Sequence, residues 1–441
     1  MLLSIPTAAP PIWLVLPFIL LLLLIATGPL FFARIWHHYY KHIAVGIGAL
    51  VAVYYIGVRH ETMLVAETFA EYISFISLLL ALFIASGGIY IFADVESKAW
   101  VNIVFLLGGA LLTNLIGTTG ASVLLIRPFM RVNRYRLKPY HIVFFIFFIS
   151  NLGGLLTPIG DPPLFMGFLK GVPFFWTLTH LWPQWLFALS LLSVVFYFFE
   201  RNNTLLDEVD VSAHYTGKII MDGKRNFIWL TLIILTVFID PNSIEGIPYI
   251  NIDGHKVSYI RELLQLLFAF GCYRFASRKA LENNSFDFEP IREVGFLFVG
   301  IFLSMIPALQ LLGNIGEGHM PRVSAGMLYW GSGICSSILD NAPAYVNFFT
   351  LTLTLFGFDV QQVESVHAFL ASPHAYYLMA VSAGAVFFGA MTYIGNGPNF
   401  MVKAIAEQTG VKMPSFFGYI FRYSIPLLLP VLVLVWLVFY F

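Results

Sequence analysis

The chain has 441 residues, of which 59% are hydrophobic and 11% are charged, and its formal net charge is zero. Soluble domains carry about 25% charged residues, so the composition excludes an ordinary soluble protein. A zero net charge gives no sign of a nucleic-acid partner. Continuous apolar runs recur along the chain, at the length of about twenty residues that a membrane-spanning helix needs, and they exclude an alternating β-barrel pattern. We therefore expect an all-α polytopic protein in a lipid bilayer.

Ten of the apolar runs predict full transmembrane spans, five on either side of a polar stretch at 201–225. Two further apolar segments, 101–126 and 323–350, have polar residues at their centres, "TNLIGTTG" and "SSILDNAP". A helix that breaks at its centre and leaves by the face it entered fits that pattern, so both are predicted re-entrant hairpins. The ten spans are 12–33, 43–58, 72–93, 140–166, 181–199, 226–240, 259–275, 293–313, 375–402 and 416–441.

Two of the predicted spans contain helix breakers where the membrane midplane should lie. One includes "SNLGGLLTPIGDPP" (Ser150 to Pro163) and the other "TYIGNGPNF" (Thr392 to Phe400). Glycine permits unusual backbone conformations, and proline prevents the helix from closing again. Because a broken backbone is costly in hydrocarbon, both breaks are expected to line a protein or water-filled site.

The two halves of the chain resemble each other around these breaks. "TPIGDPPLFM" (157–166) and "TYIGNGPNFM" (392–401) are identical at six of ten positions, and Thr113-Asn114 corresponds to Asp340-Asn341 at nearly the same offset. Five spans are an odd number, so the second half must be inverted relative to the first. We expect an inverted repeat, a plan typical of secondary transporters. Its parts are a first repeat at 1–200, a cytoplasmic linker at 201–225 and a second repeat at 226–441.

The distribution of positive charge predicts the orientation. With both termini outside, the inside loops hold 19 Lys and Arg residues and the outside loops hold 5, as the positive-inside rule requires. The first hairpin then enters from the cytoplasm, followed by a basic loop that starts at Arg127, and the second enters from outside. We expect an integral protein of a bacterial inner membrane.

Oxygen-rich side chains in the broken segments are the candidate ligands for an ion or a substrate. Asp161 and Asp340 are the two acidic residues deep in the predicted spans, where charges are costly and usually functional, although each could instead cap a restarted helix. With Asn114 and Asn341 they form the predicted Na⁺ site. The full candidate set is Thr113, Asn114, Thr118, Ser150, Asn151, Gly160, Asp161, Ser337, Asp340, Asn341, Thr392, Gly395 and Asn396.

The motifs "SNLGGLLTPIGDPP" and "SSILDNAP" resemble those of the ion transporter superfamily, closest to its NhaD-like sodium/proton antiporters and citrate transporter-like members. The resemblance implies an elevator-type transport domain on a scaffold and a homodimer. By matching position it implies binding residues at Asn114, Asp161, Asp340, Asn341 and Asn396. The hairpin tips depart from the Ser-Asn-Thr of dicarboxylate carriers, since they read Thr-Asn-Leu and Asp-Asn-Ala.

Three functions fit these features, and none needs an enzyme activity or a cofactor. No phosphate-binding loop is present, so an ion gradient is expected to supply the energy. Na⁺/H⁺ antiport is the first hypothesis, because a buried acid can hold either a proton or a cation. Na⁺- or H⁺-coupled transport of citrate or a dicarboxylate is the alternative, with Na⁺ as the coupling ion, and arsenite permeation is third. An inverted repeat argues against a channel.

Overall fold

The computed structural model describes residues 9–203, 215–239, 244, 246–252, 255–315 and 323–441 of the chain. Helices dominate it, and eight of them in the described part are long and apolar enough to cross a membrane, or nine if one bent pair counts as a span. The all-α polytopic membrane class is therefore confirmed. The number of ten spans stays a prediction.

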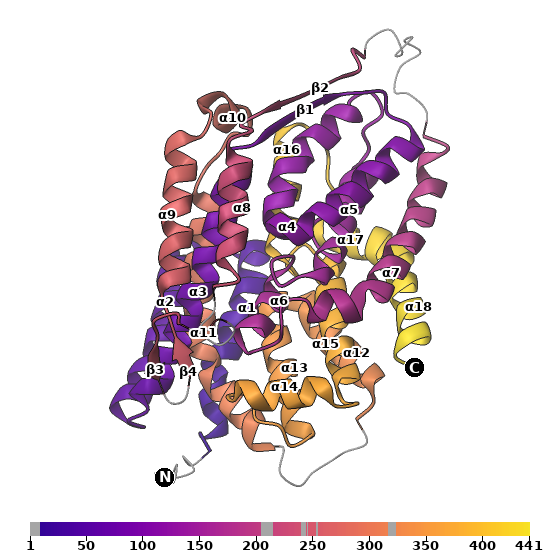
Figure 1. The fold of residues 1–441 in the computed structure, drawn as a ribbon. Helices are drawn as coiled ribbons and strands as arrows, with labels where there is room; N and C mark the ends of the chain where they lie inside the picture. The colour runs from indigo at the N-terminus through magenta and orange to yellow at the C-terminus, as the bar shows by residue number, and fades with distance from the viewer. Residues whose placement is uncertain (1–8, 204–214, 240–243, 245, 253–254, 316–322) are drawn as a thin grey trace.

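One group of helices, here called the scaffold bundle, lies on the left in Figure 1. Its long members pack along one another, and their apolar outer faces are exposed, as suits helices in lipid. The sequence placed the start of the third span at residue 72, but the helix already begins at Thr62. The members are η1 (Ile12–Val15), α1 (Leu16–Phe31), α2 (Ala33–Gly57), α3 (Thr62–Gly87), α8 (Asn226–Thr236), α9 (Ile260–Phe275), α10 (Arg278–Asn283) and α11 (Glu289–Ile315).

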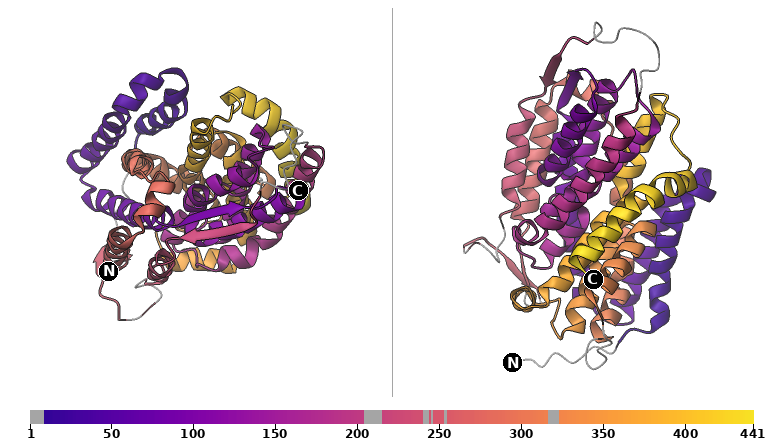
Figure 2. Two further views of the ribbon diagram at one scale, coloured as in Figure 1. Left: turned by 90° about the horizontal axis from the view of Figure 1, so that it is seen from above. Right: turned by 90° about the vertical axis from the view of Figure 1, so that its right-hand side faces the viewer.

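The second group, here called the site bundle, contains every predicted broken segment (Figures 1 and 2). Two of its members join at a sharp bend of 101° between α14 and α15. The members are α4 (Ala99–Val132), α5 (Pro139–Phe148), η2 (Leu152–Leu156), α6 (Pro162–Leu169), α7 (Trp176–Glu200), α12 (Ala325–Ile338), α13 (Asn341–Leu355), α14 (Val363–Ala371), α15 (Ala375–Phe388), η4 (Gly389–Met391), α16 (Gly397–Gln408), α17 (Phe416–Tyr419), the π-helical η5 (Ile420–Leu428) and α18 (Leu429–Phe439).

In the described part of the chain, four short strands, which the sequence analysis did not predict, lie in the connections. β1 (Tyr90–Asp94) pairs antiparallel with β2 (Lys218–Asp222), and β3 (Ile250–Ile252) pairs with β4 (His255–Val257). β1 leads from α3 to α4 and β2 leads to α8, so the first pair joins the two bundles at one end (Figure 1). Residues 204–214 of the expected linker lie outside the described residues.

The segment α4 folds back on itself at Gly117, whose φ of 76° and ψ of 158° are not helical. A straight helix of this length would extend about 50 Å. Instead its two ends meet, as the hydrogen bond from the side-chain amide of Asn102 to Asn133 at 2.7 Å shows. Leu125 also lies against Gly109, so the arms pack side by side. α4 is therefore a hairpin, here called hairpin 1, and it is longer than the predicted 101–126.

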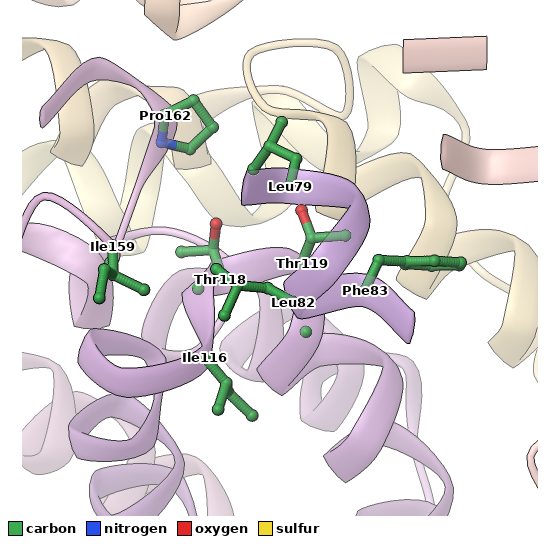
Figure 3. Close-up of a pocket in the computed structure, with 11 residues that line it drawn as sticks. Leu79, Leu82, Phe83, Ile116, Thr118, Thr119, Ile159 and Pro162 are labelled. Carbon is green, nitrogen blue, oxygen red and sulfur yellow. The ribbon is translucent and has the colours of Figure 1, made fainter. Parts of the chain in front are cut away.

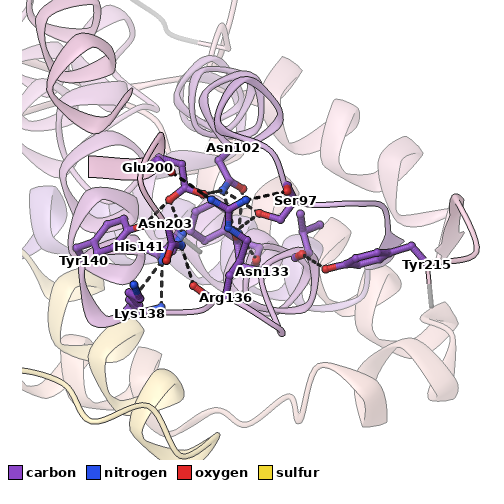
Figure 4. A network of polar contacts seen from close by, with 12 residues as sticks. Ser97, Asn102, Asn133, Arg136, Lys138, Tyr140, His141, Glu200, Asn203 and Tyr215 are labelled. Carbon is purple, nitrogen blue, oxygen red and sulfur yellow. Dashed lines mark hydrogen bonds and ion pairs between the residues drawn. The ribbon is translucent and has the colours of Figure 1, made fainter. Parts of the chain in front are cut away.

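A buried polar network closes the base of hairpin 1 (Figure 4). Its centre is the fully buried carboxylate of Glu200, at the end of α7, which lies 2.8 Å from Arg136 Nη2 and 2.9 Å from His141 Nε2. The amide of Asn102 in the first arm also donates to it, at 3.0 Å. Since Asn102 bonds to Asn133 of the second arm, the network ties both arms to α5 and α7.

Helices α12 and α13 form a second hairpin, here called hairpin 2, with its break at Leu339 and Asp340. The ring of Phe348 packs on Gly331, so residues equally far from the break are neighbours. In Figure 1 hairpin 1 occupies the upper half of the site bundle and hairpin 2 the lower half. The chain descends from α5 to α6 and ascends from α15 to α16 in the same view.

Candidate ion and substrate site

The two broken helices have the same backbone course. Asp161 precedes α6 with φ −144° and ψ 144°, and Asn396 precedes α16 with φ −154° and ψ 138°. In each break one glycine presses on another: a Cβ on Gly160 would lie 2.2 Å from the carbonyl oxygen of Gly154. The same contact recurs in the second break between Gly395 and Gly389, at 2.6 Å. Only glycine fits such positions, which accounts for the repeated glycines of the sequence.

The carboxylate of Asp161 is the point where all four broken segments meet. Its Oδ1 accepts from the hydroxyl of Thr118, in hairpin 1, at 2.8 Å and from the amide of Asn396 at 2.9 Å. Its Oδ2 accepts from the amide of Asn341, in hairpin 2, at 2.6 Å. Asp161 is 1% exposed. Three neutral donors therefore hold a buried acid, and they come from three segments that are distant in sequence.

The positions of these residues explain why a negative charge is tolerated there. Thr118 opens the second arm of hairpin 1 and Asn341 opens α13, while Asp161 and Asn396 directly precede α6 and α16. Each is thus at the N-terminal end of a helix, where unpaired backbone N–H groups make the potential positive. Four such ends converge on the carboxylate of Asp161, and the carboxylate of Asp340 lies at one of them, the start of α13.

Matching hydrogen bonds brace each hairpin against the neighbouring break. The hydroxyl of Thr157 donates to the carbonyl of Asn114 at 2.6 Å, and that of Thr392 donates to the carbonyl of Ser337 at 2.7 Å. These contacts set the register of the two hairpins: Asn114 corresponds to Ser337, and Thr118 therefore corresponds to Asn341. The register that sequence similarity suggested, with Asn114 matched to Asn341, was wrong, because it aligned the Asn side chains and not the breaks.

Several predicted residues support the site without reaching the carboxylate. Asn114 donates to Gly153 at 2.8 Å and accepts from the amide of Leu156 at 2.9 Å, so it holds η2. The hydroxyls of Thr113 and Ser337 bond within their own helices. The other members brace the breaks: Ser150 accepts from Asn396, Gly160 accepts from Thr118, Asn151 donates to Asn399, and Thr392 accepts from Gly395.

Asp340 and Asp161 occupy different chemical positions. Asp340 accepts from the backbone N–H of Ala342 at 3.1 Å and so caps α13. Asp161 makes no such capping bond in α6, although two prolines follow it. The geometry therefore gives Asp340 the role of a cap and leaves Asp161 as the shared carboxylate.

Two buried amide oxygens next to the site have no hydrogen-bond partner in the described chain. They are Oδ1 of Asn151 and Oδ1 of Asn341, both fully buried. A Cβ on Gly389 would lie 2.9 Å from the first and 3.4 Å from Nδ2 of the second, so the two amides flank this glycine. Unpaired carbonyl oxygens beside a carboxylate are the donor set that Na⁺ prefers.

The site adjoins the boundary between the two bundles. A cavity of about 10 Å³ lies there, between Leu79, Leu82 and Phe83 of α3 and the tip of hairpin 1 (Figure 3). It has room for roughly one water molecule. The hydroxyl-bearing residues Thr118 and Thr119 line it. On the other side, Phe298 and Phe302 of α11 face α13. At these two places the lining is mainly apolar, and elsewhere an ion pair of Glu71 in α3 with Lys170 at the end of α6 crosses the boundary.

One comparison with known proteins identifies a family. The model of the family CitMHS_2, whose description is "Putative citrate transport", matches residues 7–440. The search of curated proteins found no match.

Proposed function

Because this chain belongs to the CitMHS_2 family, we propose that it moves citrate or a similar carboxylate anion together with a cation or a proton. It is a secondary active transporter in this proposal, and alternating access moves the site bundle against the scaffold bundle. Two supports are the mainly apolar lining where α3 and α11 face the hairpins, and the two hairpins themselves, which reach the site from opposite ends. In transporters built from two inverted halves with such breaks, the central site opens first to one membrane face and then to the other.

The observation that carries the proposal is the convergence of four helix ends on Asp161. Such ends favour anions, while the Asp161 carboxylate and the free oxygens of Asn151 and Asn341 favour a cation or a proton. In this account the cation or proton neutralises Asp161. The donors of Thr118, Asn341 and Asn396 then become available for a carboxylate of the substrate.

Flux measurements in proteoliposomes test this function. We expect uptake of labelled citrate when an inward gradient of Na⁺ or of protons is imposed, and little uptake without either gradient. Citrate uptake at the same rate with and without these gradients, or no citrate uptake with either gradient, would contradict the proposal. Vesicles without protein are the control for leakage.

Na⁺/H⁺ antiport is the second candidate, and one observation favours it. The Asp161 carboxylate is held by neutral donors, and no Lys or Arg of the described chain bonds to it. An acid whose hydrogen-bond donors are all neutral suits competition between Na⁺ and H⁺. A Na⁺ gradient that drives proton movement in citrate-free vesicles would favour antiport over citrate transport.

We further propose a homodimer in a bacterial inner membrane, with both chain ends outside. The excess of basic residues in one set of loops supports this orientation. Labelling of a cysteine introduced near the C-terminus by a membrane-impermeant reagent should succeed in intact cells. Cross-linking of the purified protein should give a dimer band.

A further inference from the structure

Arg127 is a charged residue of hairpin 1 that has no polar partner in the described part of the chain. The sequence analysis placed it in a loop, but the helical arm continues to Val132, so Arg127 lies within the hairpin. Its side chain is partly buried, and among the described residues none accepts a hydrogen bond from it or forms an ion pair with it. Tyr90 of β1 lies near enough to interact electrostatically, but a neutral phenol gives no counter-charge. Charges inside membrane segments are costly and usually mark the path of an ion or substrate.

The face of the arm that carries Arg127 leads to the cavity. Gly120 lines that cavity, and Val123 packs with Phe83 of α3 and Ile291 of α11. Residues three and seven positions after Gly120 lie on the same side of a helix. Arg127 is therefore on the side that meets the scaffold bundle, about 10 Å from Gly120 towards the base of the hairpin. A lipid headgroup would be expected on the opposite, membrane-facing side.

Hairpin 2 has no charge at the matching place. The register that pairs Thr118 with Asn341 also pairs Val123 with Val346, and Val346 faces the scaffold bundle too, through α11. The same register pairs Arg127 with Thr350, which is 1% exposed and whose hydroxyl has no partner in the described chain. The scaffold-facing sides of the two hairpins therefore differ in charge, since hairpin 1 carries Arg127 where hairpin 2 carries Thr350.

We propose that Arg127 binds a carboxylate group of the transported anion between Asp161 and the membrane face at the base of hairpin 1. This inference rests on the proposed citrate transport. A guanidinium pairs with a carboxylate through two parallel hydrogen bonds, and citrate carries three carboxylates. When the boundary opens beside α3, the anion passes Val123 and meets Arg127 before it leaves.

Citrate uptake from each side of oriented proteoliposomes tests the proposal. Arg127→Gln should raise KM about tenfold, the loss expected for one charge-assisted contact, when citrate enters from the face at the base of hairpin 1. KM from the opposite face should stay at the wild-type value. Arg127→Lys should recover part of the loss, since it keeps the charge and loses the paired geometry.

Two control variants separate this effect from a structural one. Arg131→Gln removes an exposed arginine one turn away whose guanidinium lies over Phe92, and Thr350→Val alters the matching place in hairpin 2. Both should leave KM unchanged at the hairpin 1 face. If the wild type moves citrate and Arg127→Gln has the same KM, or the KM rises equally at both faces, the assignment of Arg127 is wrong. If the wild type moves no citrate, the proposed function itself fails. A KM rise that vanishes in vesicles without anionic lipid would assign Arg127 to a lipid phosphate and overturn the proposal.

Discussion

Hairpins 1 and 2 bring equivalent donors to one carboxylate but hold their breaks by different means. In hairpin 1 the chain turns at Gly117 with a positive φ, which side chains other than hydrogen disfavour. In hairpin 2 the chain passes through Leu339 and Asp340 in extended conformations, and Asp340 caps the next helix. The same tip geometry can therefore be built from a glycine or from a capping acid.

The bases and faces of the hairpins differ as well. Hairpin 1 is tied by the network around Glu200 and carries Arg127 on its scaffold-facing side. The helices of hairpin 2 contain no Lys, Arg, Asp or Glu. Two hairpins that present similar donors to Asp161 therefore differ in the charges that they carry away from it.

The largest expected effect is the loss of transport when the shared carboxylate is removed. Asp161→Asn keeps the size of the side chain but cannot hold a cation or exchange a proton, so we expect uptake to fall at least about a hundredfold. Ser337→Ala is the matched control, because the hydroxyl of Ser337 bonds only within its own helix. Near-normal uptake by Asp161→Asn in correctly folded protein would remove Asp161 from the mechanism.

The next largest effect concerns the base of hairpin 1. Glu200→Ala leaves the guanidinium of Arg136 without its carboxylate, and loss of one partner of a buried pair costs about 3–5 kcal/mol. We expect a lower free energy of unfolding in detergent, and a lower melting temperature. Hairpin 2 has no such network in its helices, so truncation of an exposed residue there, Met327→Ala, should have little effect. Equal melting temperatures for Glu200→Ala and the wild type would show that the network does not hold the hairpin.

A third prediction compares the two breaks directly. Gly117→Ala places a methyl group in a region of φ and ψ that is essentially confined to glycine, at a cost of about 1–3 kcal/mol. Asp340→Ala removes only a cap, worth about 1 kcal/mol, and Asp340→Asn should retain it. We expect the melting temperature to be lowest for Gly117→Ala, higher for Asp340→Ala and highest for Asp340→Asn. A loss of transport in Asp340→Asn as complete as in Asp161→Asn would instead make Asp340 a ligand.

The smallest effect is a pH dependence at the ribbon beside hairpin 1. The hydroxyl of Thr216 and the guanidinium of Arg134 both donate hydrogen bonds to the carboxyl of Asp94. The bond from Thr216 is the larger cause, and together they lower the pKa of that carboxyl to about 2. A lowered pKa in the folded protein stabilises it above the ordinary pKa of 3.8, and this part of the stability is lost as the pH falls towards 2. Thr216→Val should therefore lower the melting temperature at pH 7 by more than at about pH 3. A difference that does not change with pH would contradict the assignment.

The sequence predicted the membrane class, both hairpins, both broken helices and the acid at their centre. Those features follow from local patterns: apolar length, glycine and proline at a break, and a charge in an apolar run. The sequence did not predict that Asp340 caps α13 while Asp161 stays uncapped, because that depends on contacts between distant segments. It placed Arg127 outside the hairpin because a charge ends an apolar window, although the backbone remained helical. The similarity of Asn114 to Asn341 likewise concealed the true register.

The most direct test of the central claim, that the charge on Asp161 couples the anion to its driving ion, is calorimetric titration of citrate into the purified protein. The account predicts that the wild type binds citrate only when Na⁺ is present or the pH is low enough to protonate Asp161. It predicts that Asp161→Asn binds citrate without that requirement. Citrate binding to the wild type that is equally tight with and without Na⁺ at every pH would contradict it.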